Sequence, residues 1–470
     1  MFKYVTAVCI ILSICTSTVR AQYAEPLKDS IFSTVLNEQR AVVITLPANY
    51  GSDTAHYDVW YLLDGEWDRS QFTSTFGYMV SSQFAPPAII VSLPNRYVNG
   101  FNLRDRDLTP TRIEGIDSSG GAANYLAFFE KELMPYINKK YRVSGENGLF
   151  GGSLGGLFTI FAMLEKPSLF RFYAMADPAL HNDHQQIPRL AAKRLPTINF
   201  SNTVLNIGGR SEENSYHVMA RDMMDSVLKN YAPAGLHWHS ALYPNETHGS
   251  TMYKSQYDGL KYSYLGYYVR NARTYPNSGI VLKDRPVRLF VPTDYSDIRY
   301  TIDGSVPGRS SEKMDDHLLV SEPEKLKLFS FSPSGRYDHE IKVGLRSGDY
   351  LVPKKPRIKF KHENQLSGVF KDNGSHVMDG WVDIEKDGYY VFQVTPSKGT
   401  TLMFNDSLLL RADEKTANMR HAIILPLRKG KYALRVERSS GKGDASPIYF
   451  GMYYSENGQD DWWMNPVVKM

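Results

Sequence analysis

Cysteine is almost absent from this chain of 470 residues, since its only two copies, Cys9 and Cys15, lie near the N-terminus. From residue 22 onward the sequence therefore offers no disulfide, no thiol nucleophile and no cysteine-ligated metal. An excess of one charge is lacking as well: 54 Lys and Arg face 50 Asp and Glu, so the global charge gives no signal for nucleic acid. Beyond the N-terminus, no apolar run reaches the roughly 20 residues that a membrane helix needs. We expect neither nucleic acid binding nor a transmembrane segment.

The N-terminus has the pattern of a secretory signal peptide. Lys3 precedes an apolar run over residues 4–14, and Val19 and Ala21 occupy the −3 and −1 positions of a cleavage site. We predict cleavage between Ala21 and Gln22 and a secreted or periplasmic protein. Removing residues 1–21 deletes two basic side chains and both cysteines, so the formal charge falls from +4 to +2 (4 − 2).

The length exceeds what one hydrophobic core usually serves, and the pattern divides the chain. Residues 22–275 alternate apolar strand-like runs with helical periods, which predicts an α/β domain with a mainly parallel sheet. Residues 276–352 and 353–470 show period-two alternation and frequent turns, which predicts two all-β modules. Aromatic residues make up 13% of the chain, a content that suits strands, sugar-stacking surfaces or both.

A nucleophile motif stands in the first domain. Residues 149–156 read LFGGSLGG and are followed by a helical run over 157–164. A strand, then G-x-S-x-G, then a helix is the pattern of a nucleophile elbow, in which a side chain at Gly151 or Gly155 would clash. The motif predicts Ser153 as nucleophile and the Leu154 N–H as one donor of an oxyanion hole.

The base and the acid are expected downstream, in the order serine, acid, histidine. His248 lies on a short loop after a predicted strand and is the predicted base. The acid should follow the strand over residues 204–207, where Glu212 is the first choice and Glu213 the alternative. Whichever glutamate is not the acid is a surface residue.

A second oxyanion donor is expected in the turn at residues 61–67, YLLDGEW. Gly65 opens this turn, so the Glu66 N–H is the predicted donor and the Trp67 N–H the next choice. Asp64 is not expected to be the acid, because it precedes the nucleophile in the chain.

Four motifs together resemble one esterase family: YLLDG at 61–65, RDLTP at 106–110, GGSLGG at 151–156 and ETHG at 246–249. This α/β-hydrolase family contains esterase D, the enterochelin esterases, and the feruloyl and acetyl-xylan esterases of carbohydrate esterase family one. The resemblance covers about residues 30–270. It implies an α/β-hydrolase fold and serine carboxylic-ester hydrolysis, with Ser153, His248 and Glu212 in the three roles.

Five further residues near these motifs are candidates for a role at the site. Arg104 and Arg106 either clamp a substrate carboxylate or phenolate, or form structural ion pairs with neighbouring acids. Asp177 lies in a segment that resembles the family's substrate-pocket border after the sixth strand, so we expect it to contact substrate. His181 and His184 are three residues apart without a third ligand, and we expect no metal and no cofactor.

The C-terminal part carries two weaker resemblances. Residues 298–307, IRYTIDGSVP, are similar to the β-module at the C-terminus of chitobiases and hexosaminidases, over about 276–345. The last stretch resembles the protective-antigen-type β-sandwich that is often attached to glycosidases. Trp462 and Trp463 either stack on sugar rings or pack on that sandwich.

These features predict an exported serine esterase that removes acetyl or feruloyl groups from polysaccharide. The expected partner is an ester substrate on a glycan, with carbohydrate contact through the β-modules. This substrate class depends on the company of the modules, which is an argument by association. The alternatives are hydrolysis of a siderophore or another small ester, and a catalytically inactive carbohydrate-binding or scaffold protein.

Overall fold

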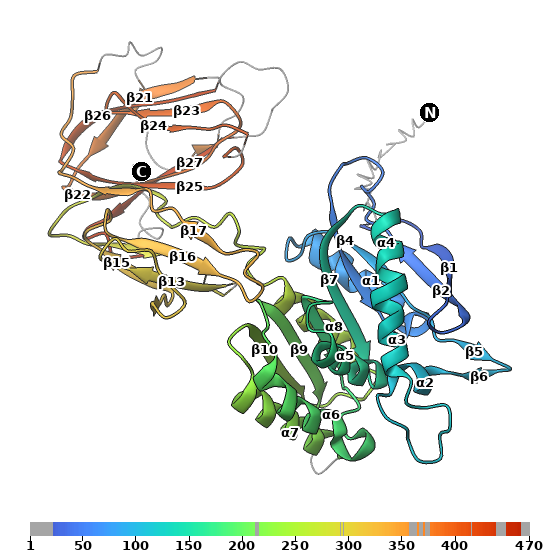
Figure 1. Ribbon diagram of the computed structural model, residues 1–470. Coiled ribbons are helices and arrows are strands. Elements are labelled where there is room, and N and C mark those ends of the chain that lie inside the picture. The colour runs from blue at the N-terminus through green and yellow to red at the C-terminus, as the bar shows by residue number, and fades with distance from the viewer. Residues whose placement is uncertain are drawn as a thin grey trace, which may run out of the picture. The chain divides into compact units, whose positions relative to one another are not determined.

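The structure is a computed structural model that describes residues 22–211, 216–291, 293–294, 296–356, 364–365, 370–371, 377–414, 416–438 and 448–461. The chain divides between Tyr264 and Leu265 into two compact units (Figure 1). The predicted signal peptide, Glu212, Glu213, Trp462 and Trp463 lie outside the described residues.

The N-terminal unit is built on one eight-stranded sheet. Its order is β1 (Leu27–Ser33), β2 (Glu38–Thr45), β4 (Ala88–Ser92), β3 (Tyr57–Leu62), β7 (Val143–Gly152), β8 (Phe172–Ala176), β9 (Thr203–Arg210) and β10 (Leu236–Tyr243). From β4 to β10 every neighbouring pair is parallel, while β1–β2 and β2–β4 are antiparallel. The predicted α/β-hydrolase class is confirmed.

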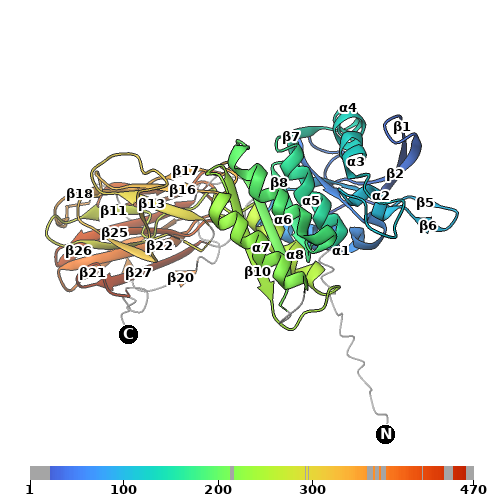
Figure 2. The same ribbon diagram turned by 60° about the horizontal axis from the view of Figure 1, so that its bottom comes forward.

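Helices cover both faces of this sheet, because its central strands are apolar on both sides. In β3, Trp60 belongs to an aromatic cluster with Phe72 and Tyr264, beneath the paired helices α1 (Gly65–Ser81) and α8 (Thr251–Ser263). Its neighbour Tyr61 points into the core on the opposite face, against Phe129. The helices of that face are α3 (Ala122–Phe128), α4 (Met134–Lys140), α5 (Leu154–Glu165), α6 (Asn182–Arg194) and α7 (Tyr216–Tyr231), and Figure 2 shows the last three side by side.

A short excursion follows β4 before the chain returns to the sheet. Strands β5 (Tyr97–Val98) and β6 (Phe101–Asn102) form a hairpin that projects from the unit (Figures 1 and 2). The five-residue helix α2 (Arg104–Leu108) comes next and packs on α3 and α5. This excursion brings the predicted RDLTP segment back to the nucleophile elbow.

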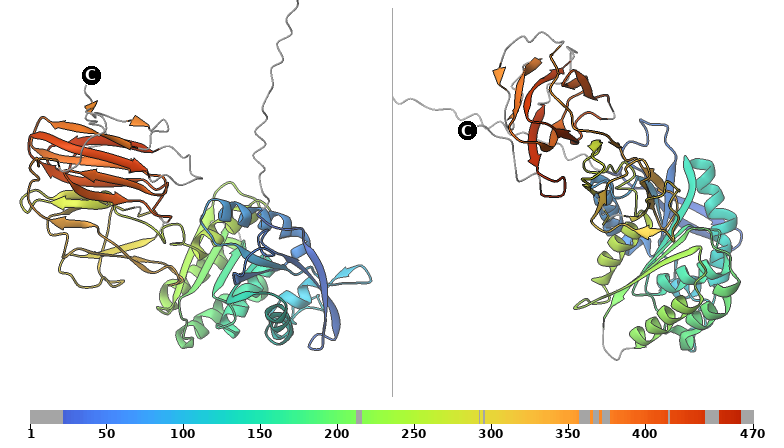
Figure 3. Two further views of the ribbon diagram at one scale, coloured as in Figure 1. Left: turned by 90° about the horizontal axis from the view of Figure 1, so that it is seen from above. Right: turned by 90° about the vertical axis from the view of Figure 1, so that its left-hand side faces the viewer.

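The C-terminal unit is organised around a six-stranded sheet, whose strands run side by side in the left panel of Figure 3. Its order is β18 (Leu345–Ser347), β11 (Ser278–Val281), β25 (His421–Leu427), β22 (Gly388–Thr395), β27 (Tyr449–Ser455) and β20 (Phe370–Lys371). A second sheet consists of β19 (Asn364–Gln365), β21 (Val377–Ile384), β26 (Gly430–Arg438), β23 (Thr400–Phe404) and β24 (Ser407–Arg411). The remaining sheets are β14 (Glu312–Lys313), β13 (Asp297–Thr301), β16 (Lys327–Phe331) and β17 (His339–Ile341), and the pair β12 (Val287–Phe290) and β15 (His317–Val320).

The sequence predicted two separate β-modules, divided at 352/353. In the structure, strands from both predicted modules lie in this one central sheet. The run in β22 shows the reason. Tyr390 and Phe392 belong to one core, beside β21, β23 and β26, whereas Tyr389 and Val391 belong to a second core, beside β12, β13 and β16. Since both faces of the strand are covered, residues 276–352 and 353–470 pack as one unit.

Candidate active site

Ser153 lies at the sharp turn between β7 and α5. Its φ is 55° and its ψ is −117°, a strained backbone conformation for a residue with a side chain. The turn is held on both sides: the Ser153 N–H donates to the Ala176 carbonyl at 2.9 Å, and its carbonyl accepts the N–H groups of Leu157 and Ala179. The sequence motif thus folds as a strand-to-helix elbow that carries Ser153 at its apex.

The glycines of the motif allow this close turn. A Cβ atom on Gly151 would lie 2.3 Å from the carbonyl carbon of Gly155, and one on Gly156 would lie 2.7 Å from the Pro178 Cβ. A Cβ on Gly155 would lie 3.1 Å from a carboxylate oxygen of Asp64. The clash at Gly151 involves backbone atoms, which cannot move aside without opening the turn.

His248 is hydrogen-bonded to an aspartate. Its Nδ1 lies 2.6 Å from Oδ2 of Asp177, the residue that directly follows β8. The histidine belongs to the loop between β10 and α8, and the Thr251 hydroxyl donates to its carbonyl at 2.9 Å. The first turn of α8 therefore fixes the backbone of the loop, while Asp177 fixes the imidazole.

Strand register brings this pair to the elbow. Gly152 is the register partner of Ala176, so Ser153 and Asp177 are the next residues on two adjacent strands. Met252, in the first turn of α8, covers the elbow, since a Cβ on Gly152 would lie 2.6 Å from its Cε. The serine, the aspartate and the histidine loop thus share the carboxyl edge of the sheet.

The aspartate at this position differs from the predicted acid. Glu212 and Glu213 lie outside the described residues, and the carboxylate that contacts His248 is Asp177, which the sequence assigned to the substrate pocket. A usable signal was present: Asp177 ends the apolar run over β8, beside the strand that carries the nucleophile. The sequence placed the acid after the strand over residues 204–207, and only the hydrogen bond shows that the carboxylate in contact with His248 is Asp177, after β8.

Asp177 stays ionised in this environment. Burial by itself would raise the pKa of Asp177, but the hydrogen bond from His248 and the positive charge of Arg210 outweigh it and lower the pKa. Arg210, at the end of β9, places its Nε 3.2 Å from Oδ2 of Asp177. The fixed negative charge is suited to hold the Nδ1–H of His248 and to stabilise an imidazolium.

The predicted oxyanion donors lie at the starts of two helices, where N–H groups have no partner within the helix. Leu154 is the first residue of α5, and Glu66 is the second residue of α1. The Trp67 N–H instead donates to the Asp64 carbonyl at 3.0 Å, and the Gly65 N–H donates to the Leu93 carbonyl at 3.0 Å. Trp67 is therefore engaged within the turn, and Leu154 and Glu66 stay the predicted donors.

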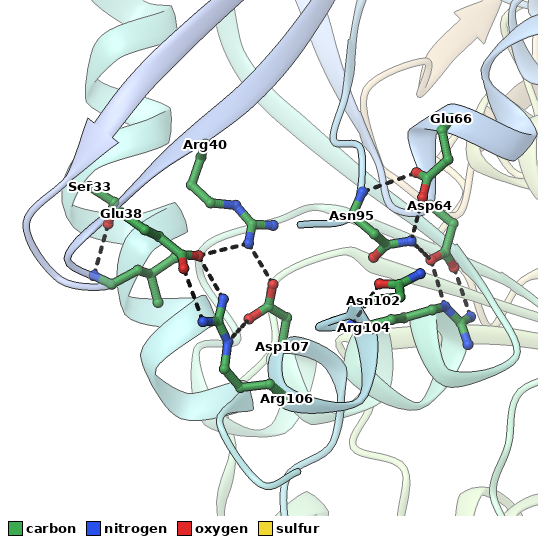
Figure 4. Close-up of polar contacts among 11 residues, drawn as sticks. Ser33, Glu38, Arg40, Asp64, Glu66, Asn95, Asn102, Arg104, Arg106 and Asp107 are labelled. Atoms are coloured by element: carbon green, nitrogen blue, oxygen red, sulfur yellow. Dashed lines mark hydrogen bonds and ion pairs between the residues drawn. The ribbon is translucent and has the colours of Figure 1, made fainter. Parts of the chain in front are cut away.

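Arg104 and Arg106 form structural ion pairs (Figure 4). Arg104 donates from Nε and Nη2 to the two carboxylate oxygens of Asp64, at 2.7 and 2.8 Å. Arg106 bonds Glu38 at 2.6 Å and Asp107 at 2.7 Å. These contacts agree with the structural interpretation of the two arginines rather than with a substrate clamp.

His181 packs against His217 rather than against His184. The two rings meet edge to face, with their centroids 4.2 Å apart. Burial lowers the pKa of His181, and the neighbouring His217 lowers it further. His181 therefore favours its neutral form at neutral pH.

Comparison with known proteins relates part of each unit to a described family. Residues 33–218 match the family described as "Putative esterase". This part of the N-terminal unit is therefore similar to that esterase family. Residues 276–342, in the other unit, match the chitobiase/beta-hexosaminidase C-terminal domain, as the sequence predicted.

Two curated relatives match part of the chain. The ferri-bacillibactin esterase BesA of Bacillus subtilis is 32% identical over 149 residues, which are 27% of this chain and 49% of that protein. The siderophore enterobactin esterase of Emericella nidulans is 33% identical over 143 residues, or 27% of this chain and 47% of that protein. The chain thus spans about half the length of the curated relatives it matches.

A solved structure is similar to part of the chain. An IroE-like serine hydrolase from Shewanella oneidensis is 31% identical, with a TM-score of 0.47, and the match covers 50% of this chain and 79% of that one.

Within the described residues of both units, no helix has the length and apolar character needed to cross a bilayer.

Proposed function

We propose that this protein is a serine carboxylic-ester hydrolase with Ser153, His248 and Asp177 as its catalytic residues. The observation that carries the proposal is the Asp177–His248 hydrogen bond of 2.6 Å at the sheet edge that bears the strained serine elbow. The match of residues 33–218 to the esterase family supports the reaction class. Asp177 replaces the predicted glutamates as the proposed acid.

The reaction follows from these positions. His248 takes the proton of the Ser153 hydroxyl through Nε2, and Oγ attacks the carbonyl carbon of the ester. Asp177 holds the opposite ring nitrogen and stabilises the imidazolium, while the N–H groups of Leu154 and Glu66 bind the oxyanion. His248 then protonates the leaving alcohol, and an acyl-enzyme remains. A water molecule, deprotonated by the same histidine, releases the acid and restores the serine.

For the substrate, we propose a siderophore ester. Two curated relatives carry names that assign them to ferri-bacillibactin and to enterobactin, and both match part of this chain at above 30% identity. This choice reverses the order predicted from sequence, which put polysaccharide esters first. Export through residues 1–21 is part of the proposal, since a siderophore esterase outside the cytoplasm would meet its substrate at the cell envelope.

An ester on a glycan is the second candidate. The match of residues 276–342 to the chitobiase/beta-hexosaminidase C-terminal domain favours it, because that domain accompanies sugar-processing enzymes. The two candidates share the catalytic residues and differ in the part of the substrate beyond the scissile bond.

The test begins with the nucleophile. Ser153→Ala should lower turnover of p-nitrophenyl acetate by at least about 10³-fold, measured by release of nitrophenolate. The same two proteins are then assayed on ferri-bacillibactin, ferric enterobactin, acetylated xylan and feruloylated arabinoxylan, with products separated by chromatography. Release from the siderophores supports the first candidate, and release from the glycans alone supports the second. Equal turnover by wild type and Ser153→Ala would contradict the proposed function and favour an inactive scaffold.

A further inference from the structure

The two proposed oxyanion donors stand on turns that belong to different strands. Leu154 follows β7 and Glu66 follows β3, and these strands pair in parallel up to Leu62 and Phe150. A further bond joins the Leu63 N–H to the Phe150 carbonyl at 3.0 Å, and each chain then turns into its own helix. Two donors stabilise one oxyanion only if their separation is fixed before the substrate arrives. A contact beyond the sheet is therefore needed to hold the two turns.

One arginine, Arg104, makes that contact, and Figure 4 shows its ion pair with Asp64. The Nε and Nη2 of Arg104, at the start of α2, bind the carboxylate of Asp64, and the same Nη2 donates to the Gly152 carbonyl at 3.1 Å. Asp64 stands two residues before Glu66, and Gly152 directly precedes Ser153. A single guanidinium thus bonds to the oxyanion turn and to the nucleophile elbow.

Burial makes this connection rigid. The side chain of Asp64 is 3% exposed and that of Arg104 is 17% exposed. Asp64 has a φ of 53°, and one of its carboxylate oxygens packs over Gly155 in the elbow. Burial alone would lower the pKa of Arg104, but the hydrogen bonds to Asp64 reverse the effect and raise it. A bidentate, charged pair of this kind has a defined geometry as well as a defined distance.

Asn95 closes the network from a third segment, just after β4. Its Nδ2 donates to Asp64 at 2.8 Å and to the carboxylate of Glu66 at 2.9 Å (Figure 4). Its backbone N–H donates to the other Glu66 oxygen at 3.0 Å. The residue that bears the proposed donor is thereby attached to the same Asp64 that Arg104 holds.

We propose that Arg104 is a positioning residue, which fixes the Glu66 N–H relative to the Ser153 elbow through Asp64 and the Gly152 carbonyl. This inference depends on the proposed ester hydrolysis. Its action is on the transition state, because the separation of the two donors matters most once the oxyanion has formed. Loss of the connection should thus lower kcat and leave KM nearly unchanged. A clamp on the substrate would instead change KM, and mainly for substrates that carry a negative charge.

The test compares Arg104→Lys with wild type on p-nitrophenyl acetate, which carries no negative charge. We expect kcat to fall by about 10- to 100-fold and KM to stay within about threefold of the wild-type value. The expected loss is smaller than the fall of about 10²- to 10³-fold in kcat that follows removal of a whole oxyanion donor. The inhibition constant of phenylboronic acid, which forms a tetrahedral adduct on a serine, should rise in parallel. Asp64→Asn breaks the same ion pair with a side chain of the same shape, and it should show the same pattern.

Arg171→Lys is the matched control. Arg171 also bonds a carboxylate, that of Glu146, and backbone carbonyls, at Ser201 and Asn202, but it precedes β8 at the opposite end of the strand. This variant should keep the kcat of wild type. Circular dichroism and melting temperature establish that every variant is folded, and Asp64→Asn decides the matter if Arg104→Lys does not fold.

The outcomes separate the inference from the proposed function. Suppose that wild type is active, that Ser153→Ala is inactive, and that kcat is unchanged in both Arg104→Lys and Asp64→Asn. This result would overturn the role of Arg104 and leave the esterase assignment intact. A rise in KM alone would also overturn it, in favour of a clamp. A wild type that hydrolyses no ester would remove the proposed function, and the inference with it.

Discussion

The pairing of His248 with Asp177 gives the sharpest test of the site, through Asp177→Asn. The imidazolium that forms in the transition state has its Nδ1 2.6 Å from the carboxylate, which puts the centres of the two charges about 4 Å apart. At an effective dielectric constant of about 20, a charge pair at that separation is stabilised by about 4 kcal/mol, or nearly three decades in rate. The histidine side chain is 42% exposed, so solvent screening reduces this value. We expect kcat to fall by about 10²- to 10³-fold.

The assay is initial-rate hydrolysis of p-nitrophenyl acetate at pH 8, with kcat and KM determined separately. Asp177→Asn also weakens the ion pair between Asp177 and Arg210, which should lower the free energy of unfolding by about 1–3 kcal/mol. Urea denaturation of the variant therefore accompanies the kinetics.

Two further variants complete the comparison. Asp183→Asn replaces an exposed acid close to Asp177 in the chain and should leave the rate unchanged. Glu212→Gln tests the acid predicted from sequence and should cost less than about threefold in kcat. The assignment of the acid would be refuted if kcat of Asp177→Asn stayed within tenfold of the wild-type value while Glu212→Gln lost most of its activity.

Two other predictions concern stability. Burial, with a smaller contribution from the charge of Asp64, raises the pKa of Asp68 from its ordinary value of 3.8 to about 6. The ionised form is therefore disfavoured in the folded state, and the free energy of unfolding falls as the pH rises from 4 to 6. Asp68→Asn should thus raise the free energy of unfolding by about 1–3 kcal/mol at pH 8 and by almost nothing at pH 4; in urea titrations, an equal gain at both pH values would contradict this cause. The second prediction concerns Gly151. Gly151→Ala should lower the free energy of unfolding by more than about 3 kcal/mol or prevent folding, because the new Cβ would lie 2.3 Å from a backbone carbon. Gly249→Ala, with open space around the new Cβ, should leave the free energy of unfolding nearly unchanged. Soluble expression and melting temperature compare the two glycine variants, and similar values would refute the steric role of Gly151.

Much of the fold and part of the site could be predicted from local sequence. The elbow is encoded within eight consecutive residues, and the apolar runs of β3, β7 and β8 indicate a sheet covered on both faces. The loop position of His248 was likewise visible, since it follows one strand and precedes one helix. Each of these features depends on neighbours in the chain, which is why periodicity and motif spacing are informative about them.

The roles of the charged residues could not be predicted in the same way. Arg104 finds Asp64 at a distance of 40 residues in the chain, and Asp177 meets His248 at 71. Sequence allowed a substrate clamp or an ion pair for Arg104, and it assigned Asp177 to the substrate pocket and the role of acid to Glu212 or Glu213. In both cases the role of the residue depends on which distant segments of the chain the sheet brings together.

The sequence by itself thus determined the α/β class, the serine elbow and the absence of cysteine after residue 21. Tertiary structure alone decided that Asp177 orients His248, that Arg104 joins two turns, and that β11 and β25, more than 100 residues apart, lie in one central sheet. The physical reason is the same in each case. Local sequence patterns indicate which face of a helix or strand is apolar. Strand register and buried ion pairs determine which distant segment packs against that face.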